Sequence, residues 1–316
     1  MNHIIAVVPV YNEERNVQEL ADRLINSLRQ VSEDYGIILV DDGSVDQTWA
    51  NIVALSDKEP RLQGLRLSRN FGQHTAISAG LDVAEADWVI VMDGDLQDRP
   101  EVIPDLYAKA AQGHDVVFVA REERPENRAY QLGQKVFYKT LRFLTGTDYD
   151  PAHGNFSIIS NKVLTHYKDI SESSRFYGGL VEWLGFRRAT LSARHGVRFA
   201  GETSYNFIRR LRFAKNIILS FSIRPLYAAL AFGAIVTVFA FCIGVVVLIR
   251  ALFFGYTVEG WASLMVSIYF IGGVQMLMIG MNGLYISRIA EEVKSRPLYV
   301  VSEITGGKQR NLSNSQ

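Results

Sequence analysis

The sequence is poor in cysteine: Cys242 is the only one among 316 residues. A single cysteine cannot form an internal disulfide, so a disulfide framework is excluded and the chain is compatible with a reducing compartment. Cys242 lies in an apolar run, where packing is its expected role. The first residues also lack the basic start and the small-residue cleavage site of a signal peptide. We therefore expect the first domain to stay in the cytosol.

Net charge is absent as well, because 33 basic residues balance 33 acidic ones. A balanced chain has no general attraction to nucleic acid or to an anionic surface, so we expect no nucleic-acid partner. At this length, with 48% hydrophobic residues, the chain is long enough for one sizeable α/β domain and a smaller part.

Charged residues are missing from two long segments, 226–249 with 24 residues and 261–286 with 26. At about 1.5 Å per residue, each is long enough to cross a hydrocarbon core of roughly 30 Å. A buried helix of a soluble protein is the alternative, but such helices seldom run for about 18 residues without a charge. The sequence therefore predicts two transmembrane helices joined by an external loop, 250–260.

Basic residues flank this pair of segments on both sides, which by the positive-inside rule predicts a two-span protein of the inner (cytoplasmic) membrane with both ends cytosolic. They are Arg209, Arg210, Arg212 and Lys215 before the pair, and Arg288, Lys294 and Arg296 after it. Residues 206–225 predict a juxtamembrane amphipathic helix that lies on headgroups, or alternatively packs on its own domain. Residues 287–316 are expected to form a cytosolic tail, disordered from residue 306 onward.

Residues 1–205 alternate short β-rich runs with helical patterns. This alternation predicts an α/β domain with a Rossmann-like, mostly parallel sheet that binds ligands at the carboxyl ends of its strands. The predicted strands are 4–8, 37–40, 62–67, 88–92 and 115–119, and the predicted helices are 16–28, 47–55, 73–83 and 102–112.

Two polar motifs follow the first two predicted strands: PVYNEE at residues 9–14 and DDGSVD at residues 41–46. Their carboxylates are suited to accept hydrogen bonds from a base N–H or from ribose hydroxyls, and Gly43 allows a tight turn. Taken alone, residues 41–46 also fit an ordinary turn with a helix cap.

A third motif, DGDLQD at residues 93–98, follows a strongly apolar strand. A diphosphate would repel bare carboxylates, so Asp93 and Asp95 favour a divalent cation between them and the ligand, either Mg²⁺ or Mn²⁺. Gly94 allows a close backbone approach, and Gln97 can orient a metal-bound water or a phosphate oxygen. Such a metal would stabilise a departing nucleotide diphosphate.

These blocks resemble the family 2 glycosyltransferases of the GT-A fold, and more narrowly the polyprenyl-phosphate glycosyltransferases related to dolichyl-phosphate mannose synthase. The resemblance rests on VPVYNEE (8–14), VDDGS (40–44) with Asp46, SRNFG (68–72), AGL (79–81) and DGDLQD (93–98) with PE (100–101). It continues more loosely to GNF (154–156) and RFAG (198–201), and the two apolar segments fit the polyprenyl-phosphate glucosyltransferase branch.

The resemblance implies a role for each matching residue. The nucleoside would be held by Pro9, Tyr11, Glu13, Asp42 and Asn70, with Asp93 at its diphosphate; the metal would be held by Asp93, Asp95 and Gln97. The loop REERPENR at residues 121–128 resembles the family's acceptor loop, which would set Arg121, Arg124 and Arg128 against the lipid phosphate together with Arg198. A solvated loop with internal ion pairs, and a snorkelling Arg198, are the structural alternatives.

The sequence departs from its relatives at GNFS (154–157), where many members have Gly-Asp-Phe-Arg. Asn155 cannot accept a proton as a carboxylate would. A phosphate acceptor is already ionised near neutral pH, so Asn155 is predicted to act at the catalytic centre by positioning, with Asp93, Asp95 and Arg121. Asp148 and Asp150 are nearby substitutes for a base, although both are expected in loops or caps.

The predicted activity is inverting transfer of a sugar from a nucleotide diphosphate, with UDP and glucose first, to polyprenyl (undecaprenyl) phosphate. An amino-modified sugar and GDP-mannose stay open. A membrane polysaccharide synthase of the same fold is one alternative, although the Arg-Trp pair of such enzymes is absent. A non-catalytic sugar-nucleotide-binding scaffold is the other. Gly272, Gly273, Gly280 and Gly283 are compatible with a homo-oligomer. A downstream flippase, or a pathway that uses the lipid-linked sugar, is the other expected partner.

Overall fold

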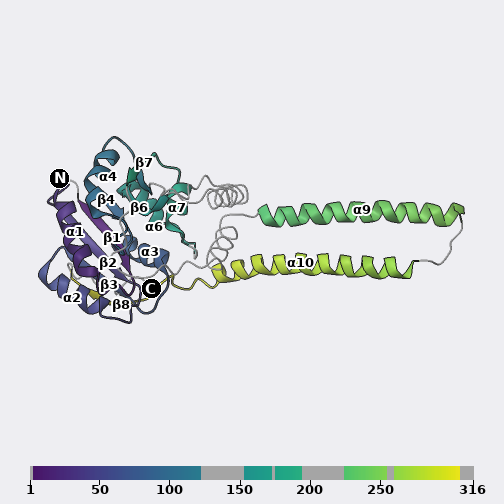
Figure 1. Ribbon diagram of the computed structural model, residues 1–316, viewed down its shortest axis with the longest axis horizontal. Helices are drawn as coiled ribbons and strands as arrows, with labels where there is room; N and C mark the ends of the chain where they lie inside the picture. Colours follow the sequence, from purple (N-terminus) through teal and green to yellow (C-terminus); the bar gives the residue numbers. More distant parts are fainter. Residues whose placement is uncertain (1–2, 122–152, 173–174, 194–223, 255–259, 307–316) are drawn as a thin grey trace, which may run out of the picture. The chain divides into compact units, whose positions relative to one another are not determined.

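The computed structural model describes residues 3–121, 153–172, 175–193, 224–254 and 260–306 (Figure 1). These residues form two compact units. One unit contains the residues up to 193 together with those from 296 onward, and the other contains residues 224–295.

The first unit confirms every predicted strand and helix of the α/β domain, with ends shifted by a few residues. They are β1 (Ile4–Val10), α1 (Val17–Arg29), β2 (Tyr35–Asp41), α2 (Thr48–Lys58), β3 (Leu62–Leu67), α3 (Gln73–Val83), β4 (Trp88–Val91), η1 (Pro100–Val102) with α4 (Ile103–Ala110), and β5 (Val116–Arg121). Further along the chain the unit adds β6 (His153–Ser160), α6 (Asn161–Lys168), α7 (Tyr177–Trp183), β7 (Arg188–Ala193) and β8 (Val301–Thr305).

The sheet has the order β7-β5-β6-β4-β1-β2-β3-β8 and is mixed. Its centre, β4-β1-β2-β3, is parallel as predicted, whereas β6 pairs antiparallel with both β4 and β5. The expectation of a mostly parallel sheet therefore holds for the centre and for the pair β5-β7, whereas β6 and the edge strand β8 are antiparallel to their neighbours. The two antiparallel strands, β6 and β8, come from segments whose sequence shows no alternation of strands and helices.

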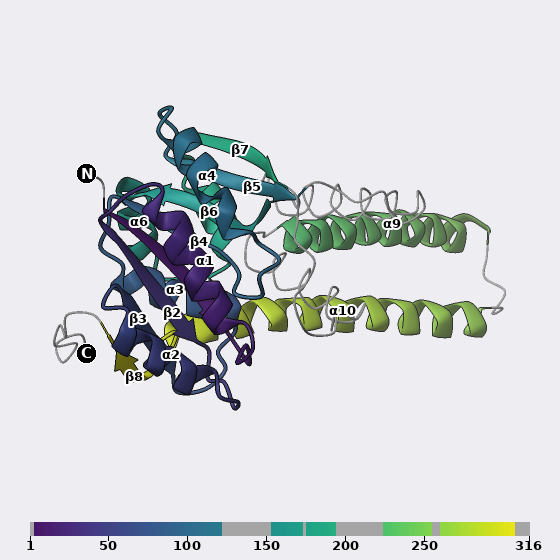
Figure 2. The ribbon, with the colours of Figure 1, turned by 60° about the vertical axis from the view of Figure 1, so that its left-hand side comes forward.

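Helices cover both faces of the sheet (Figure 2). Every residue of β1 is buried, so this strand shows no polar alternation. Ile4, Ala6, Val8 and Val10 belong to the core beneath α1, α2 and α4, and α3, α6 and α7 pack together on the opposite face. This layering leaves the strand ends as the place where polar loops gather.

Strand β8 was not anticipated, because residues 287–316 were expected to form a tail. It lies at the sheet edge and pairs antiparallel with β3 from Gly64↔Thr305 to Leu67↔Val301. The strand is short and most of its residues are exposed, so the sequence shows no alternation of apolar and polar residues by which it could be recognised.

The second unit contains two long helices, α9 (Arg224–Phe254) and α10 (Trp261–Val293). Both apolar segments are thus helical, and Gly233 of α9 faces Met278 of α10. Within the described residues, one window, Phe270–Ser287 of α10, is long and apolar enough to cross a membrane, and α9 contains a shorter apolar stretch, Leu230–Ile243. The predicted amphipathic segment 206–225 lies almost wholly outside the described residues.

Candidate active site at the carboxyl ends of the strands

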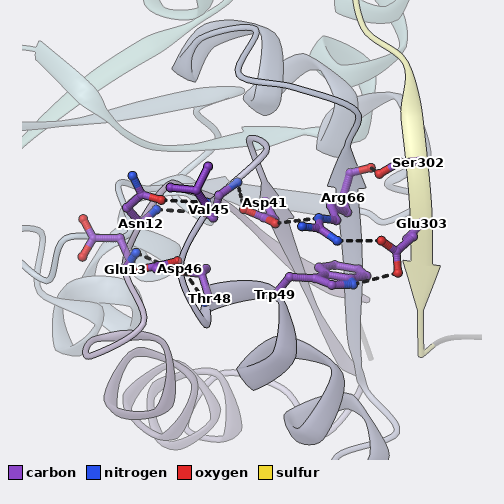
Figure 3. A network of polar contacts seen from close by, with 11 residues as sticks. Asn12, Glu13, Asp41, Val45, Asp46, Thr48, Trp49, Arg66, Ser302 and Glu303 are labelled. Carbon is purple, nitrogen blue, oxygen red and sulfur yellow. Dashed lines mark hydrogen bonds and ion pairs between the residues drawn. The ribbon is translucent and has the colours of Figure 1, made fainter.

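The loops after β1 and β2 are joined by reciprocal hydrogen bonds (Figure 3). The backbone N–H of Asn12 donates to Ser44 Oγ at 2.9 Å, and the N–H of Val45 donates to Asn12 Oδ1 at 3.0 Å. Next along the chain, the N–H of Glu13 donates to Thr48 Oγ1 at 2.8 Å. Asn12 adopts a positive φ of 54°, which an asparagine tolerates better than most side chains. The two motifs of the sequence therefore form one continuous polar rim.

Asp42 is a buried residue of this rim, with only 3% of its surface exposed, and it binds a neighbouring loop. Its carboxylate accepts the N–H groups of Phe71 at 2.7 Å and Gly72 at 2.9 Å, which draws the loop between β3 and α3 to the rim. Burial raises the pKa of the Asp42 carboxyl, and these two backbone donors oppose the shift. Asp42 therefore holds another loop in place, in addition to any contact with a ligand.

Gly43 explains why the loops can approach so closely. Its φ is +70°, and a Cβ atom at this position would stand 2.5 Å from the carbonyl carbon of Arg69. No side chain fits there without moving backbone. Asn70, a predicted nucleoside contact, is exposed on this same loop.

The DGDLQD motif begins two residues after β4, next to the loop that follows β1. A Cβ on Gly94 would lie 2.9 Å from the carbonyl oxygen of Pro9, so only glycine lets the two loops touch. Leu96 has a φ of 61° and is 2% exposed, which anchors the turn in the core. Asp95 Oδ1 accepts the N–H of Gln97 at 3.0 Å.

Asp93 is contacted by two amide side chains. Gln73 Nε2 donates to Asp93 Oδ1 at 2.6 Å, and Asn155 Nδ2 donates to the same oxygen at 3.0 Å. Asn155 comes from β6, 62 residues further along the chain. The structure thus brings the predicted catalytic Asn155 directly to the predicted metal-binding Asp93.

Gln73 is the contact that the sequence analysis missed. It follows the SRNFG block at residues 68–72 and opens α3, so its place just after a recognised motif was the available signal. An exposed glutamine carries no chemical signature of its own, and only the fold sets it beside Asp93.

The donor set fits a divalent cation that is shared with a ligand. In the described part of the chain, no group of three or more His, Cys, Asp or Glu side chains is placed to hold a metal ion. Asp93, Asp95 and Gln97 offer oxygen donors only, and Mg²⁺ in proteins is often held by one or two carboxylates with water and substrate phosphates completing the shell. The residues of the rim that the structure describes therefore fit a metal whose shell is completed by water or a ligand, and they form no closed protein cage.

The remaining predicted site residues lie partly at the rim and partly beyond the described residues. Pro9 is buried, Tyr11 is 44% exposed at the rim, and Glu13 is half-buried. Arg121 ends β5, and its side chain lies outside the described residues. Arg124, Arg128 and Arg198, together with Asp148 and Asp150, also lie outside them, so their roles stay predictions.

The fold and the site define a GT-A-like α/β protein: a mixed sheet with helices on both faces and an acidic motif at the end of its fourth strand. Among solved structures, the mannosyltransferase PcManGT from Pyrobaculum calidifontis in complex with GDP-Man and Mn²⁺ has this architecture, with 17% identity, a TM-score of 0.50, and coverage of 94% of this chain and 88% of that chain. At this identity the likeness concerns the fold alone.

Residues 5–168 match the family described as Glycosyl transferase family 2, and the chain belongs to this family. An uncharacterized glycosyltransferase of Synechocystis sp. is 38% identical over 95% of both chains. The SfII prophage-derived bactoprenol glucosyl transferase of Shigella flexneri is 36% identical over 95% of this chain and 97% of its own. The undecaprenyl-phosphate 4-deoxy-4-formamido-L-arabinose transferase of Proteus mirabilis is 30% identical over 100% and 98%. The protein is therefore a glycosyltransferase.

Proposed function

We propose that this glycosyltransferase moves a hexose, with glucose as the first candidate, from a UDP-linked donor to polyprenyl phosphate at the cytosolic face of the inner membrane. The observation that carries the proposal is the convergence of Gln73 and Asn155 on Asp93, beside Asp95. The two amides are neutral donors that orient this carboxylate, and neither of them adds a positive charge beside it.

The donor half of the reaction is supported by the rim. Tyr11 offers an exposed aromatic face for a base, and the joined loops after β1 and β2 offer polar groups for a nucleoside. Asp93, Asp95 and Gln97 would hold Mg²⁺ or Mn²⁺, which when bound neutralises the diphosphate that leaves the sugar. The mannosyltransferase of the same fold was solved as a complex with GDP-Man and Mn²⁺, which agrees with this assignment.

The acceptor half is supported by the relatives. The relatives from Shigella flexneri and Proteus mirabilis have a bactoprenol or an undecaprenyl-phosphate acceptor in their names, and each match extends over nearly the full length of both chains. One is named for glucose and the other for a modified arabinose, so the acceptor is the common element. A phosphate acceptor is ionised at neutral pH, which suits a site where Asn155 stands in place of a base.

Because the acceptor needs no base, catalysis depends mainly on the positions of the donor and the acceptor. The acceptor oxygen attacks the anomeric carbon from the side opposite the diphosphate, and the bond to the diphosphate breaks with inversion. Asn155 and Gln73 keep the Asp93 carboxylate oriented toward the diphosphate, and the buried Asp42 keeps the loop of Asn70 at the rim. Arginines of the loop 121–128 and Arg198 are the proposed phosphate contacts.

The two-span topology is supported by the sheet itself. β7 precedes the helices α9 and α10 in the chain, β8 follows them, and both strands belong to one sheet. A single sheet lies on one side of a membrane, so the chain between residues 193 and 301 must cross an even number of times. Since Phe270–Ser287 of α10 is long and apolar enough to cross, we propose that α9 crosses as well, with 1–205 and 287–316 cytosolic.

The proposal is tested by transfer of label into lipid. Purified full-length protein in detergent is incubated with undecaprenyl phosphate, Mn²⁺ or Mg²⁺, and one of a panel of radiolabelled nucleotide sugars. We expect one donor to give organic-phase label that requires the metal. Asp95→Ala should lower the rate by about 100-fold or more, because the metal contributes several kcal/mol to stabilising the departing charge.

Asp57→Ala is the matched control, since Asp57 is an exposed carboxylate of α2 away from the rim, and it should retain the wild-type rate. Metal-dependent polymer without lipid-linked label would replace the proposal with a polysaccharide synthase. Nucleotide binding without any transfer would favour a sugar-nucleotide-binding scaffold.

A further inference from the structure

Strand β8, which follows the second apolar helix, is connected to the polar rim by a series of side-chain contacts (Figure 3). Glu303 of β8 accepts hydrogen bonds from Arg66 of β3 at 2.7 Å and from the indole N–H of Trp49 at 3.0 Å. These donors lower the pKa of the Glu303 carboxyl, so it is ionised at neutral pH. The guanidinium of Arg66 also lies 5.8 Å from the centroid of the Trp49 ring, which fixes its orientation.

Arg66 links Glu303 to a fully buried carboxylate. Its Nε lies 3.5 Å from Oδ2 of Asp41, a residue with 0% exposure, and this oxygen has no hydrogen-bond partner within the described part of the chain. The other oxygen, Oδ1, accepts the N–H of Ser44 at 3.0 Å. A buried carboxylate with so few donors depends on the nearby cation, because an unpaired buried charge is costly.

Ser44 carries the link to the nucleoside loops. Its hydroxyl accepts the N–H of Asn12, so the turn held by Asp41 also sets the loop after β1. Asp42, which follows Asp41 directly, gathers the loop at residues 68–72. The path from Glu303 to the loop after β1 therefore passes through Arg66, Asp41 and Ser44.

A second contact reaches the same rim from the same segment. The carbonyl oxygen of Val300, one residue before β8, accepts the N–H of Ser68 at 2.8 Å, at the start of the loop that carries Asn70. Tyr299 donates to Asp82 of α3 at 2.9 Å, so this end of the segment is tied down as well. Residues 299–303 thus hold both the turn at 41–44 and the loop at 68–72.

We propose that Glu303 and Arg66 are positioning residues for donor binding: the C-terminal strand holds Arg66 against Asp41 and so keeps the nucleoside-binding loops in their binding arrangement. The inference rests on the proposed function, in which these loops receive the nucleotide. It gives the segment after α10 a role in donor binding that is exerted through Arg66 and Asp41.

The test measures nucleotide affinity in full-length protein in detergent, by calorimetric titration with UDP and with GDP, each with Mn²⁺. Glu303→Gln keeps the shape of a residue whose side chain is 52% exposed, so the protein should fold. We expect its dissociation constant for the nucleotide that wild type binds to rise about three- to tenfold, as is usual for a residue that acts through others. Glu33→Gln, an exposed residue of the loop before β2, should match wild type.

Two further variants distinguish an effect of Glu303 on the nucleoside-binding loops from a general loss of stability of β8. Thr305→Val removes the hydroxyl contact with Ser56 at 2.7 Å and so loosens β8 without touching Arg66; it should lower the melting temperature and leave nucleotide affinity unchanged. Arg66→Gln should weaken binding, and adding Glu303→Gln to it should weaken binding no further, because both act along one path.

The result that overturns the inference is a wild-type affinity in Glu303→Gln, or a loss of affinity in Thr305→Val as large as that in Glu303→Gln. Failure of the proposed function looks different, because wild type itself would then bind neither UDP nor GDP.

Discussion

At the scale of single residues, buried polar groups account for much of the site. Asp41 and Asp42 follow each other at the end of β2 and are both buried, yet they act differently. Asp41 has Arg66 as its cation, whereas Asp42 has two backbone donors from a neighbouring loop. Burial raises the pKa of both carboxyls, so each is retained at a cost in folding free energy. That cost is expected at a functional rim.

His74, next to Gln73, allows a test of the packing around the site. Its Nδ1 atom is buried without a hydrogen-bond partner among the described residues, and its ring meets Phe176 edge-on at 4.9 Å. Burial lowers the pKa of His74 to about 4, from 6.5. The unfolded chain therefore gains a proton between pH 6.5 and 4 that the folded protein does not, and stability falls as pH falls through this window.

We expect wild type to lose about 2 kcal/mol of stability between pH 7.5 and 5 from this group alone, because each unit of pKa difference corresponds to roughly 1.4 kcal/mol. His74→Phe, which keeps an aromatic ring against Phe176, should lose correspondingly less. Thermal unfolding of both proteins at the two pH values measures the difference. Equal losses would mean that His74 is solvated or paired in the folded protein.

At the scale of elements, β8 closes the edge of the sheet. It pairs with β3 over residues 301–305 and contributes Thr305 and Glu303 to contacts with α2. An unpaired edge strand exposes backbone donors and acceptors to other chains. The segment therefore serves the stability of the first unit as well as the arrangement of its rim.

A chain that ends after Leu298 should melt at least about 5 °C lower than wild type, since roughly 2–4 °C corresponds to 1 kcal/mol in a domain of this size. It should also form larger species in size-exclusion chromatography in detergent, because β3 becomes an exposed edge. A chain that ends after Gly306 keeps β8 and is the control. Equal melting of the two truncated proteins would show that β8 adds nothing to stability.

At the scale of the whole molecule, connectivity is the main constraint. The sheet takes strands from before and after the two long helices, so any membrane crossing by one helix requires a second crossing. This constraint depends only on chain order and strand pairing. It needs no assumption about the arrangement of the two units.

The topology is tested with single cysteines in a Cys242→Ala background. Thr257→Cys lies between α9 and α10, and Asn311→Cys lies after β8. In intact cells we expect a membrane-impermeant maleimide to label the first and to label the second only after permeabilisation. Labelling of Asn311→Cys in intact cells would contradict a cytosolic sheet, and protection of both positions would contradict the crossing of the two helices.

Much of the fold could be predicted from the sequence because its signals are local. The apolar runs that became β1, β2 and β4 are buried along nearly their whole length, and the helices between them have apolar faces. The polar motifs after these strands were predicted to meet at one rim, and the hydrogen bonds between Asn12, Ser44 and Val45 confirm this for the first two motifs.

The sequence by itself thus determined the parallel centre of the sheet, the two long apolar helices, the family and the acidic motif, since each depends on residues close together in the chain. Only the tertiary structure decided the reversed β6 that sets Asn155 on Asp93, the contact from Gln73, and the return of β8 to Arg66. These contacts join residues 20 to 237 positions apart. A local sequence pattern cannot indicate contacts between residues so far apart in the chain. Strand pairing at a sheet edge and side-chain contacts between loops form only when the whole sheet assembles.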